Sequence, residues 1–196
     1  PDSSGRFSID IHSFTYEFSG NLRGPELTNV AQNSTDRDRL AAVDAFANGH
    51  VLTFYTEPDY SVLGGTDHTA EFRIIDPATG ALIRNTEIDE GGSLDGDHTA
   101  LDVAVLAGGQ FVLVYHQTYV GYVFRIGNTE TSALGPQVNI PALADPNTVY
   151  YNRGAHVVAL QDGGFFIAWL EAAGALYGQR YGAYGDPIGA RFPVAE

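Results

Sequence analysis

The chain has 196 residues, of which 44% are hydrophobic and 17% are charged, which is enough apolar material for one well-packed domain and excludes the composition of a disordered chain. Its net charge of −14, from 24 Asp and Glu against 10 Arg, argues against nucleic acid and anionic membrane surfaces as partners. The absence of cysteine excludes disulfides and thiolate metal sites, and no apolar run approaches the ~18 residues of a membrane-spanning helix, so we expect no membrane insertion.

Residues that favour strands and turns dominate the composition. Aromatic residues make up 12% of the chain and 23 residues are glycine, while lysine and methionine are absent. The first 35 residues show short strand-like stretches at 7–12, 14–18 and 26–30. We expect this region to form either a partial repeat or a cap on the edge of a sheet.

Three ten-residue segments then follow one pattern: residues 46–55 (FANGHVLTFY), 106–115 (LAGGQFVLVY) and 160–169 (LQDGGFFIAW). Each segment begins with a large apolar residue, has glycine at its fourth position and ends on a tyrosine or tryptophan after a mostly apolar run. The copies begin 60 and 54 residues apart, a period that is typical of repeat architectures with one supersecondary unit per repeat.

Each segment reads as the central strand of a hairpin. The runs 111–115 and 165–169 are apolar at every position, which predicts strands buried on both faces and therefore sheets that stack face to face. Ala-Asn-Gly, Ala-Gly-Gly and Gln-Asp-Gly precede these runs, and such turns link the strands of a hairpin. The preceding strands are expected at 40–46, 101–106 and 155–160.

A strand that carries an arginine follows each central strand, and we take Arg73, Arg125 and Arg180 as equivalent. A residue that recurs at one position usually serves the architecture, so we expect pairing with carboxylates or packing over aromatic rings; an anion-binding channel is the alternative. The long spacing from Tyr55 to Arg73 predicts an inserted loop at 57–68, and such insertions often lie on a binding face.

Four antiparallel strands per repeat is the number found in a propeller blade. The predicted fold is all-β and β-propeller-like, with a β-sandwich-like stack as the alternative. Repeats at 36–90, 91–140 and 141–196 follow the partial repeat or cap at 1–35, and all four parts belong to one structural domain.

Residues 158–194 resemble a β-propeller-like repeat of very large secreted bacterial proteins, which often also carry RTX-type calcium-binding arrays. The matching residues are Leu160, Asp162, Gly163, Gly164, Phe165 and Trp169, followed by 177–181, Gly185, Pro187, Gly189, Phe192 and Val194. The resemblance implies a propeller-like repeat in a secreted or cell-surface protein and no known catalytic residues. The Gly-Gly-x-Gly-x-Asp nonapeptide is absent from this chain, so calcium does not carry over with the resemblance.

Two groups of residues are candidates for ligand binding. Aromatic side chains beside polar ones are typical of sugar-stacking sites, although ordinary packing between sheets is the first interpretation. The candidates from the predicted insertion and from the second repeat are Asp59, Tyr60, Asp67, His68, Tyr119 and Tyr122.

A cluster of carboxylates among glycines, at 89–98, is the candidate metal site. Calcium takes six to eight oxygen ligands, and Asp-x-Asp spacing lets two carboxylates converge from one loop. The candidate ligands are Asp89, Glu90, Asp95 and Asp97, with a solvated acidic loop as the first interpretation. Asp-His-Thr-Ala occurs twice, at different phases of the repeat, so we take it as coincidence rather than as a metal site of His68 and His98.

The chain opens on proline rather than methionine, which we take as the mark of a processed product or a fragment. No G-x-S-x-G elbow is present, and we expect no enzyme activity. We expect a non-catalytic extracellular structural or adhesive module, or an assembly subunit, of a bacterial surface or secreted protein. Its expected partners are further copies of itself or the remainder of a longer chain. A carbohydrate-binding module with glycan ligands is the alternative, and a hydrolase is the less favoured one.

Overall fold

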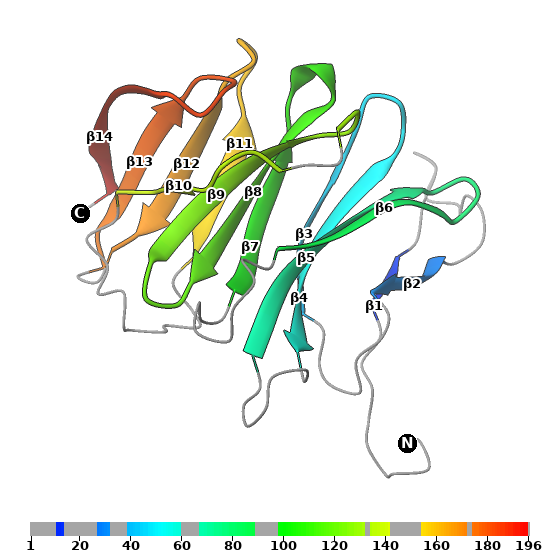
Figure 1. Cartoon of the computed structure of the whole chain (residues 1–196). Helices are drawn as coiled ribbons and strands as arrows, with labels where there is room; N and C mark the ends of the chain where they lie inside the picture. The colour runs from blue at the N-terminus through cyan, green and yellow to red at the C-terminus, as the bar shows by residue number, and fades with distance from the viewer. Residues whose placement is uncertain are drawn as a thin grey trace.

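The computed structural model describes residues 11–13, 27–31, 39–59, 67–88, 98–131, 134–141, 154–171 and 174–195 (Figure 1). These residues form three four-stranded antiparallel sheets and one two-stranded sheet. The predicted all-β architecture of antiparallel four-stranded repeats is therefore confirmed, and it is consistent with both the propeller-like fold and its sandwich-like alternative.

The strands of each large sheet follow one another in chain order. The first sheet contains β3 (Arg39–Ala45), β4 (Val51–Asp59), β5 (Asp67–Asp76) and β6 (Ala81–Ile88). The second contains β7 (His98–Val105), β8 (Gln110–Gln117), β9 (Gly121–Asn128) and β10 (Val138–Asn139), with a 3-10 turn, η1 (Ala107–Gly109), between β7 and β8. The third contains β11 (Ala155–Ala159), β12 (Phe165–Leu170), β13 (Leu176–Tyr181) and β14 (Pro187–Ala195). The small sheet pairs β1 (Ile11–Ser13) with β2 (Leu27–Ala31).

The glycine of the repeated motif closes the first hairpin of each sheet. In the first sheet the Phe46 N–H donates to the carbonyl of His50 at 2.9 Å, and Gly49 within this turn has a φ of 88°. Gly109 and Gly163 take φ values of 77° and 87° at the matching positions. A side chain with a Cβ is strained at such angles, which explains why glycine stands at the fourth position of all three segments.

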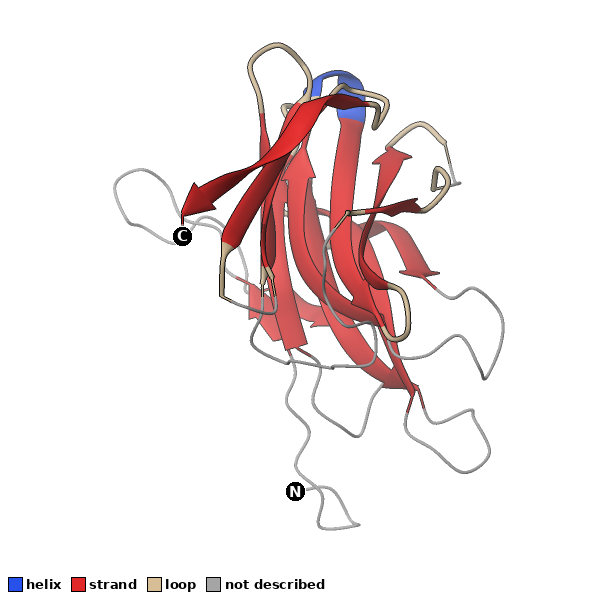
Figure 2. Ribbon diagram, turned by 90° about the vertical axis from the view of Figure 1, so that its left-hand side faces the viewer, coloured by secondary structure: helices blue, strands red, loops and turns tan. Residues whose placement is uncertain are grey.

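The large sheets lie side by side as layers, with their first strands β3, β7 and β11 as neighbours (Figures 1 and 2). One apolar core fills the space between the first and second sheets, where the rings of Phe72 and Phe111 lie 5.2 Å apart. A second core lies between the second and third sheets, where the rings of Phe124 and Phe165 lie 5.3 Å apart. The repeat therefore gives the same kind of apolar contact between sheets at both places where two large sheets meet.

The ends of the central strands are buried as predicted, because Tyr55, Tyr115 and Trp169 are all 0% exposed. The run 111–115 is buried on both faces, since the second sheet has a neighbour on either side. The run 165–169 differs from the prediction. Phe165, Ile167 and Trp169 are buried, but the alternating residues of β12 are only half-buried, because their face of the third sheet points away from the second.

The insertion expected at 57–68 is partly strand. β4 and β5 continue pairing as far as Asp59 opposite Asp67, so the first repeat has a longer hairpin than the other two. Residues 60–66 lie outside the described part of the chain. A sequence spacing alone does not distinguish a long loop from two longer strands, which is why the predicted loop was too wide.

Candidate functional site

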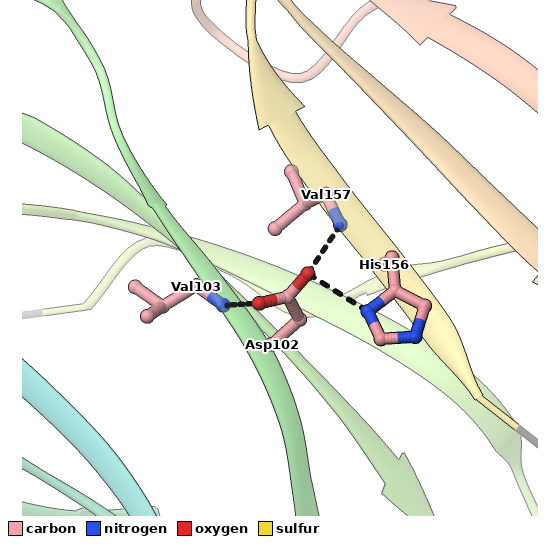
Figure 3. Close-up of polar contacts among 4 residues, drawn as sticks. All are labelled: Asp102, Val103, His156 and Val157. Atoms are coloured by element: carbon pink, nitrogen blue, oxygen red, sulfur yellow. Dashed lines mark hydrogen bonds and ion pairs between the residues drawn. The ribbon is translucent and has the colours of Figure 1, made fainter. Parts of the chain in front are cut away.

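The junctions between sheets hold a carboxylate that joins the first strand of one sheet to the first strand of the next. At the first junction, Asp44 accepts hydrogen bonds from the N–H of Ala45 and from the N–H of Val105 on β7, both at 2.7 Å. At the second, Asp102 accepts from the N–H of Val103 and from the N–H of Val157 on β11, both at 2.9 Å (Figure 3).

The two bridges share one geometry although they stand at different positions. Asp44 lies opposite Leu52 on β4, and Asp102 lies opposite Val114 on β8, so Asp102 sits two residues earlier in its repeat. In both cases the carboxylate holds the amide that follows it and the corresponding amide of the next sheet. Charged acceptors give the stronger class of hydrogen bond, so each bridge fixes the register between two sheets.

His156 adds a third contact at the second bridge. Its Nδ1 atom lies 3.2 Å from Oδ2 of Asp102, and its side chain is mostly exposed (Figure 3). A serine hydrolase needs a nucleophile beside such a pair. None of the residues whose side chains the structure describes is a serine, so the described residues do not complete a Ser-His-Asp arrangement.

Two of the three recurrent arginines contact a tyrosine of their own sheet. Arg73 is buried, with its Nε donating to Glu71 at 3.2 Å and to Asn85 at 3.1 Å, and its guanidinium lies over the ring of Tyr55. Arg125 donates from Nε to the hydroxyl of Tyr115 at 3.1 Å, and burial lowers the pKa of this arginine. These contacts agree with an architectural role for both side chains.

Arg180 is not equivalent to the other two, and the prediction was wrong here. Arg73 lies opposite Thr53 and Arg125 opposite Leu113, but the same register position of the third sheet holds Gln179, opposite Ile167. Because side chains alternate along a strand, a shift of one residue places Arg180 on the opposite face.

The two side chains in question have different surroundings. Gln179 is buried and donates from Nε2 to the carbonyls of Arg180, Ile188 and Gly189. Arg180 is exposed and pairs with Asp162 of the β11–β12 turn. The hydrogen bond from the Gly164 N–H, followed by the charge of Arg180, lowers the pKa of Asp162.

The predicted ligand-binding residues lie at two places. Asp59 and Asp67 face each other at the end of the β4–β5 pairing, and His68 follows on β5 opposite Pro58. Tyr60 lies outside the described residues. The backbone of the described members of this group therefore lies at one end of the long hairpin.

Tyr119 and Tyr122 are three residues apart but have opposite surroundings. Tyr119 lies in the β8–β9 turn, 65% exposed, with a φ of 70° that tyrosine rarely adopts. Tyr122 is buried, and its ring lies 5.7 Å from that of His116. Of the two, only Tyr119 offers a ring to a ligand.

The predicted calcium ligands Asp89, Glu90, Asp95 and Asp97 all lie outside the described residues. Within the described part of the chain, no three His, Asp or Glu side chains gather as a metal site would require. His98, from the repeated Asp-His-Thr-Ala string, is buried with its ring 5.7 Å from that of Tyr115.

The Asp44 and Asp102 bridges were missed by the sequence analysis. They do not align between repeats, so the repeat pattern gives no signal for them. The available signal was an aspartate within each of the otherwise apolar stretches 40–46 and 101–106, since a buried or half-buried carboxylate needs partners.

No protein-family model matches this sequence, and a search of curated proteins also finds no match. Among the described residues there is no helix with the length and apolar character to cross a membrane.

Proposed function

We propose that this chain is a non-catalytic structural, adhesive or assembly module of a secreted or surface protein of bacteria. The observation that supports this most is the use of the polar residues within the stack. Asp44 and Asp102 join neighbouring sheets, and Arg73 and Arg125 contact tyrosines of their own sheets. Residues that hold layers in register serve a scaffold, whereas a catalytic site needs polar groups converging on a space for substrate.

The extracellular location is proposed from the sequence. A chain without cysteine folds without disulfides, and the third repeat resembles repeats of large secreted bacterial proteins. Calcium binding by the acidic stretch at 89–98 stays a prediction of the same kind.

Carbohydrate binding is the second candidate, and Tyr119 favours it. An exposed ring held at an uncommon backbone angle is a typical feature of ligand sites, where such strain persists for a functional reason. Tyr119 lies on a hairpin turn between two buried strands, so a rigid scaffold presents its ring.

A glycan array with three proteins separates the two functions. The native chain, Tyr119→Ala and Tyr184→Ala are compared, because Tyr184 is also exposed, at 83%, but lies on the β13–β14 turn. The structural proposal predicts no signal above background from any of the three. A signal that disappears in Tyr119→Ala and persists in Tyr184→Ala contradicts it and supports a carbohydrate-binding module.

A further inference from the structure

The third sheet has an apolar face that points away from the stack, called here the outer face. Its exposed apolar residues are Val158 at 54%, Ile188 at 47%, Phe192 at 48% and Val194 at 47%. Phe166 and Arg180 belong to the same face, because they pair with Val158 and Ile188 across the strands. Figure 2 views the molecule from this side.

Phe166, Phe192 and Val194 form an apolar cluster on the outer face. The ring of Phe166 covers Gly178 so closely that a Cβ there would lie 2.1 Å from its Cζ atom, and 3.1 Å from Val194. The ring of Phe192 lies 5.9 Å from that of Phe166. A contiguous apolar patch with a fixed shape is typical of an interaction site, unlike scattered exposed apolar residues.

The strand register shows that the outer face is equivalent to two covered faces. These are the face of the first sheet that packs on the second sheet, and the face of the second sheet that packs on the third. Phe166 occupies the position of Leu52 in the first sheet and of Val112 in the second. Leu52 and Val112 are both 0% exposed, because a neighbouring sheet packs on each. The outer face is therefore built as a sheet-packing surface.

At the other end of the stack, Val43 and Leu82 on the far face of the first sheet are 58% and 55% exposed, but the middle of that face is covered. In the middle of the far face of the first sheet, Thr53, Tyr55 and Arg73 are 2%, 0% and 6% exposed. In a head-to-tail contact, the first sheet of one copy would pack on the third sheet of another. That contact would require these residues to be accessible. Two copies can instead meet through the same face, the arrangement of two-fold symmetric dimers.

Charge favours contact at this end of the molecule. The first repeat, 36–90, has eleven carboxylates and four arginines, while the third, 141–196, has five carboxylates and three arginines. Repulsion between two strongly acidic chains is therefore weaker when their third repeats meet than when their first repeats do.

We infer that the outer face of the third sheet binds the same face of a second copy and forms a symmetric dimer. This inference rests on the proposed function as an assembly module and identifies its contact surface. Strands of five to nine residues, at about 3.3 Å per residue and about 4.8 Å between strands, give a face of roughly 300–500 Å². That is less than the ~800 Å² per partner of standard-size stable complexes, so we expect a weak dimer that exchanges with the monomer.

Sedimentation velocity from about 1 to about 300 µM tests the inference on the full chain. We compare the native chain with Phe192→Glu and with Leu82→Glu. Leu82 is the matched control, because it is 55% exposed on β6, the edge strand of the first sheet. Circular dichroism checks that all three remain folded.

The native chain and Leu82→Glu are expected to shift from the 21.0 kDa monomer to twice that mass with rising concentration. Phe192→Glu is expected to weaken the dimer by at least about tenfold, since the buried charge appears twice at the symmetric contact. A native chain that stays monomeric, a dimer unaffected by Phe192→Glu, or species that grow without limit overturns the inference. Failure here leaves the proposed structural module standing, and a Tyr119-dependent glycan signal contradicts that structural role without affecting the dimer.

Discussion

The two faces of the third sheet are made from the same strands and differ mainly in what covers them. On β12, Phe165 and Ile167 point toward the second sheet and are 0% exposed, whereas Phe166 between them is only half-buried. Both faces carry aromatic and aliphatic side chains, so hydrophobicity does not separate them. The presence of a neighbouring sheet does, since the second sheet packs on the inner face, whereas the outer face leaves apolar side chains exposed.

The comparison also separates two uses of the first strand. β3 and β7 each carry an aspartate that binds the next sheet, while β11 has His156 and Val158 at the positions of Asp102 and Asp44. The third sheet therefore offers a next layer an apolar surface without the carboxylate that fixes register inside the chain. This difference is expected if the layer it meets belongs to another molecule.

The largest effect is expected on the inner face. Trp169→Ala should lower the free energy of unfolding by about 3–5 kcal/mol, the usual range for a fully buried large aromatic residue. Phe166→Ala, on the outer face of the same strand, should lower it by less than about 1.5 kcal/mol, because its ring is only half-buried. Urea denaturation of dilute protein measures both, and equal losses would show that the two faces are not different.

An intermediate effect is expected at the inter-sheet bridge. Asp102→Ala leaves the N–H of Val157 without its acceptor and should lower stability by about 1–3 kcal/mol. Val158→Ala is the control, since Val158 is exposed in the monomer, and should change stability by less than about 0.5 kcal/mol. Both are compared in the same urea titration, and a loss at Asp102 no larger than that at Val158 would refute the bridge as a register-fixing contact.

The smallest effect is expected at alkaline pH. Tyr181 lies on the inner face, stacked on Phe165 at 5.2 Å, and burial raises its pKa from 10.0 to about 12. Since the folded pKa is the higher one, its contribution is complete below pH 10 and is lost as pH rises toward 12.

Thermal unfolding between pH 9 and about pH 12 measures this contribution. Tyr181→Phe cannot ionise, so its melting temperature should fall less steeply with pH than that of the native chain. Tyr184→Phe, on an exposed turn, should follow the native curve. Superimposed curves for Tyr181→Phe and the native chain would contradict the placement of Tyr181 in the core.

The repeated ten-residue pattern was sufficient to predict the sheets, because its glycine and its apolar run each have a local physical cause. The equivalence of Arg180 failed for an equally simple reason. Arg125 lies ten residues after Tyr115, but Arg180 lies eleven after Trp169, and one residue along a strand reverses the face. The residue of the third sheet that is equivalent to Arg125 is Gln179. Counting ten residues from Trp169 identifies it, whereas searching for a matching arginine does not.

Features that depend on contacts between sheets could not be predicted from the sequence. The partner of Asp102 is an amide 55 residues away, and no local pattern indicates it. Tyr119 and Tyr122 belong to one short stretch, yet one is exposed on a turn and the other is buried. Candidate sites chosen by residue type alone therefore mix surface and core positions.

The most direct test of the account uses the absence of cysteine from the native chain. A single thiol is introduced by Ile188→Cys on the outer face or by Ile167→Cys on the inner face, and its alkylation rate is measured at about 1 µM and about 300 µM protein. Ile188→Cys is expected to be labelled fast in dilute protein and protected at high concentration, and Ile167→Cys is expected to be protected at both concentrations. Labelling of Ile188→Cys that is equally fast at both concentrations would contradict the assignment of the outer face as an interface between copies.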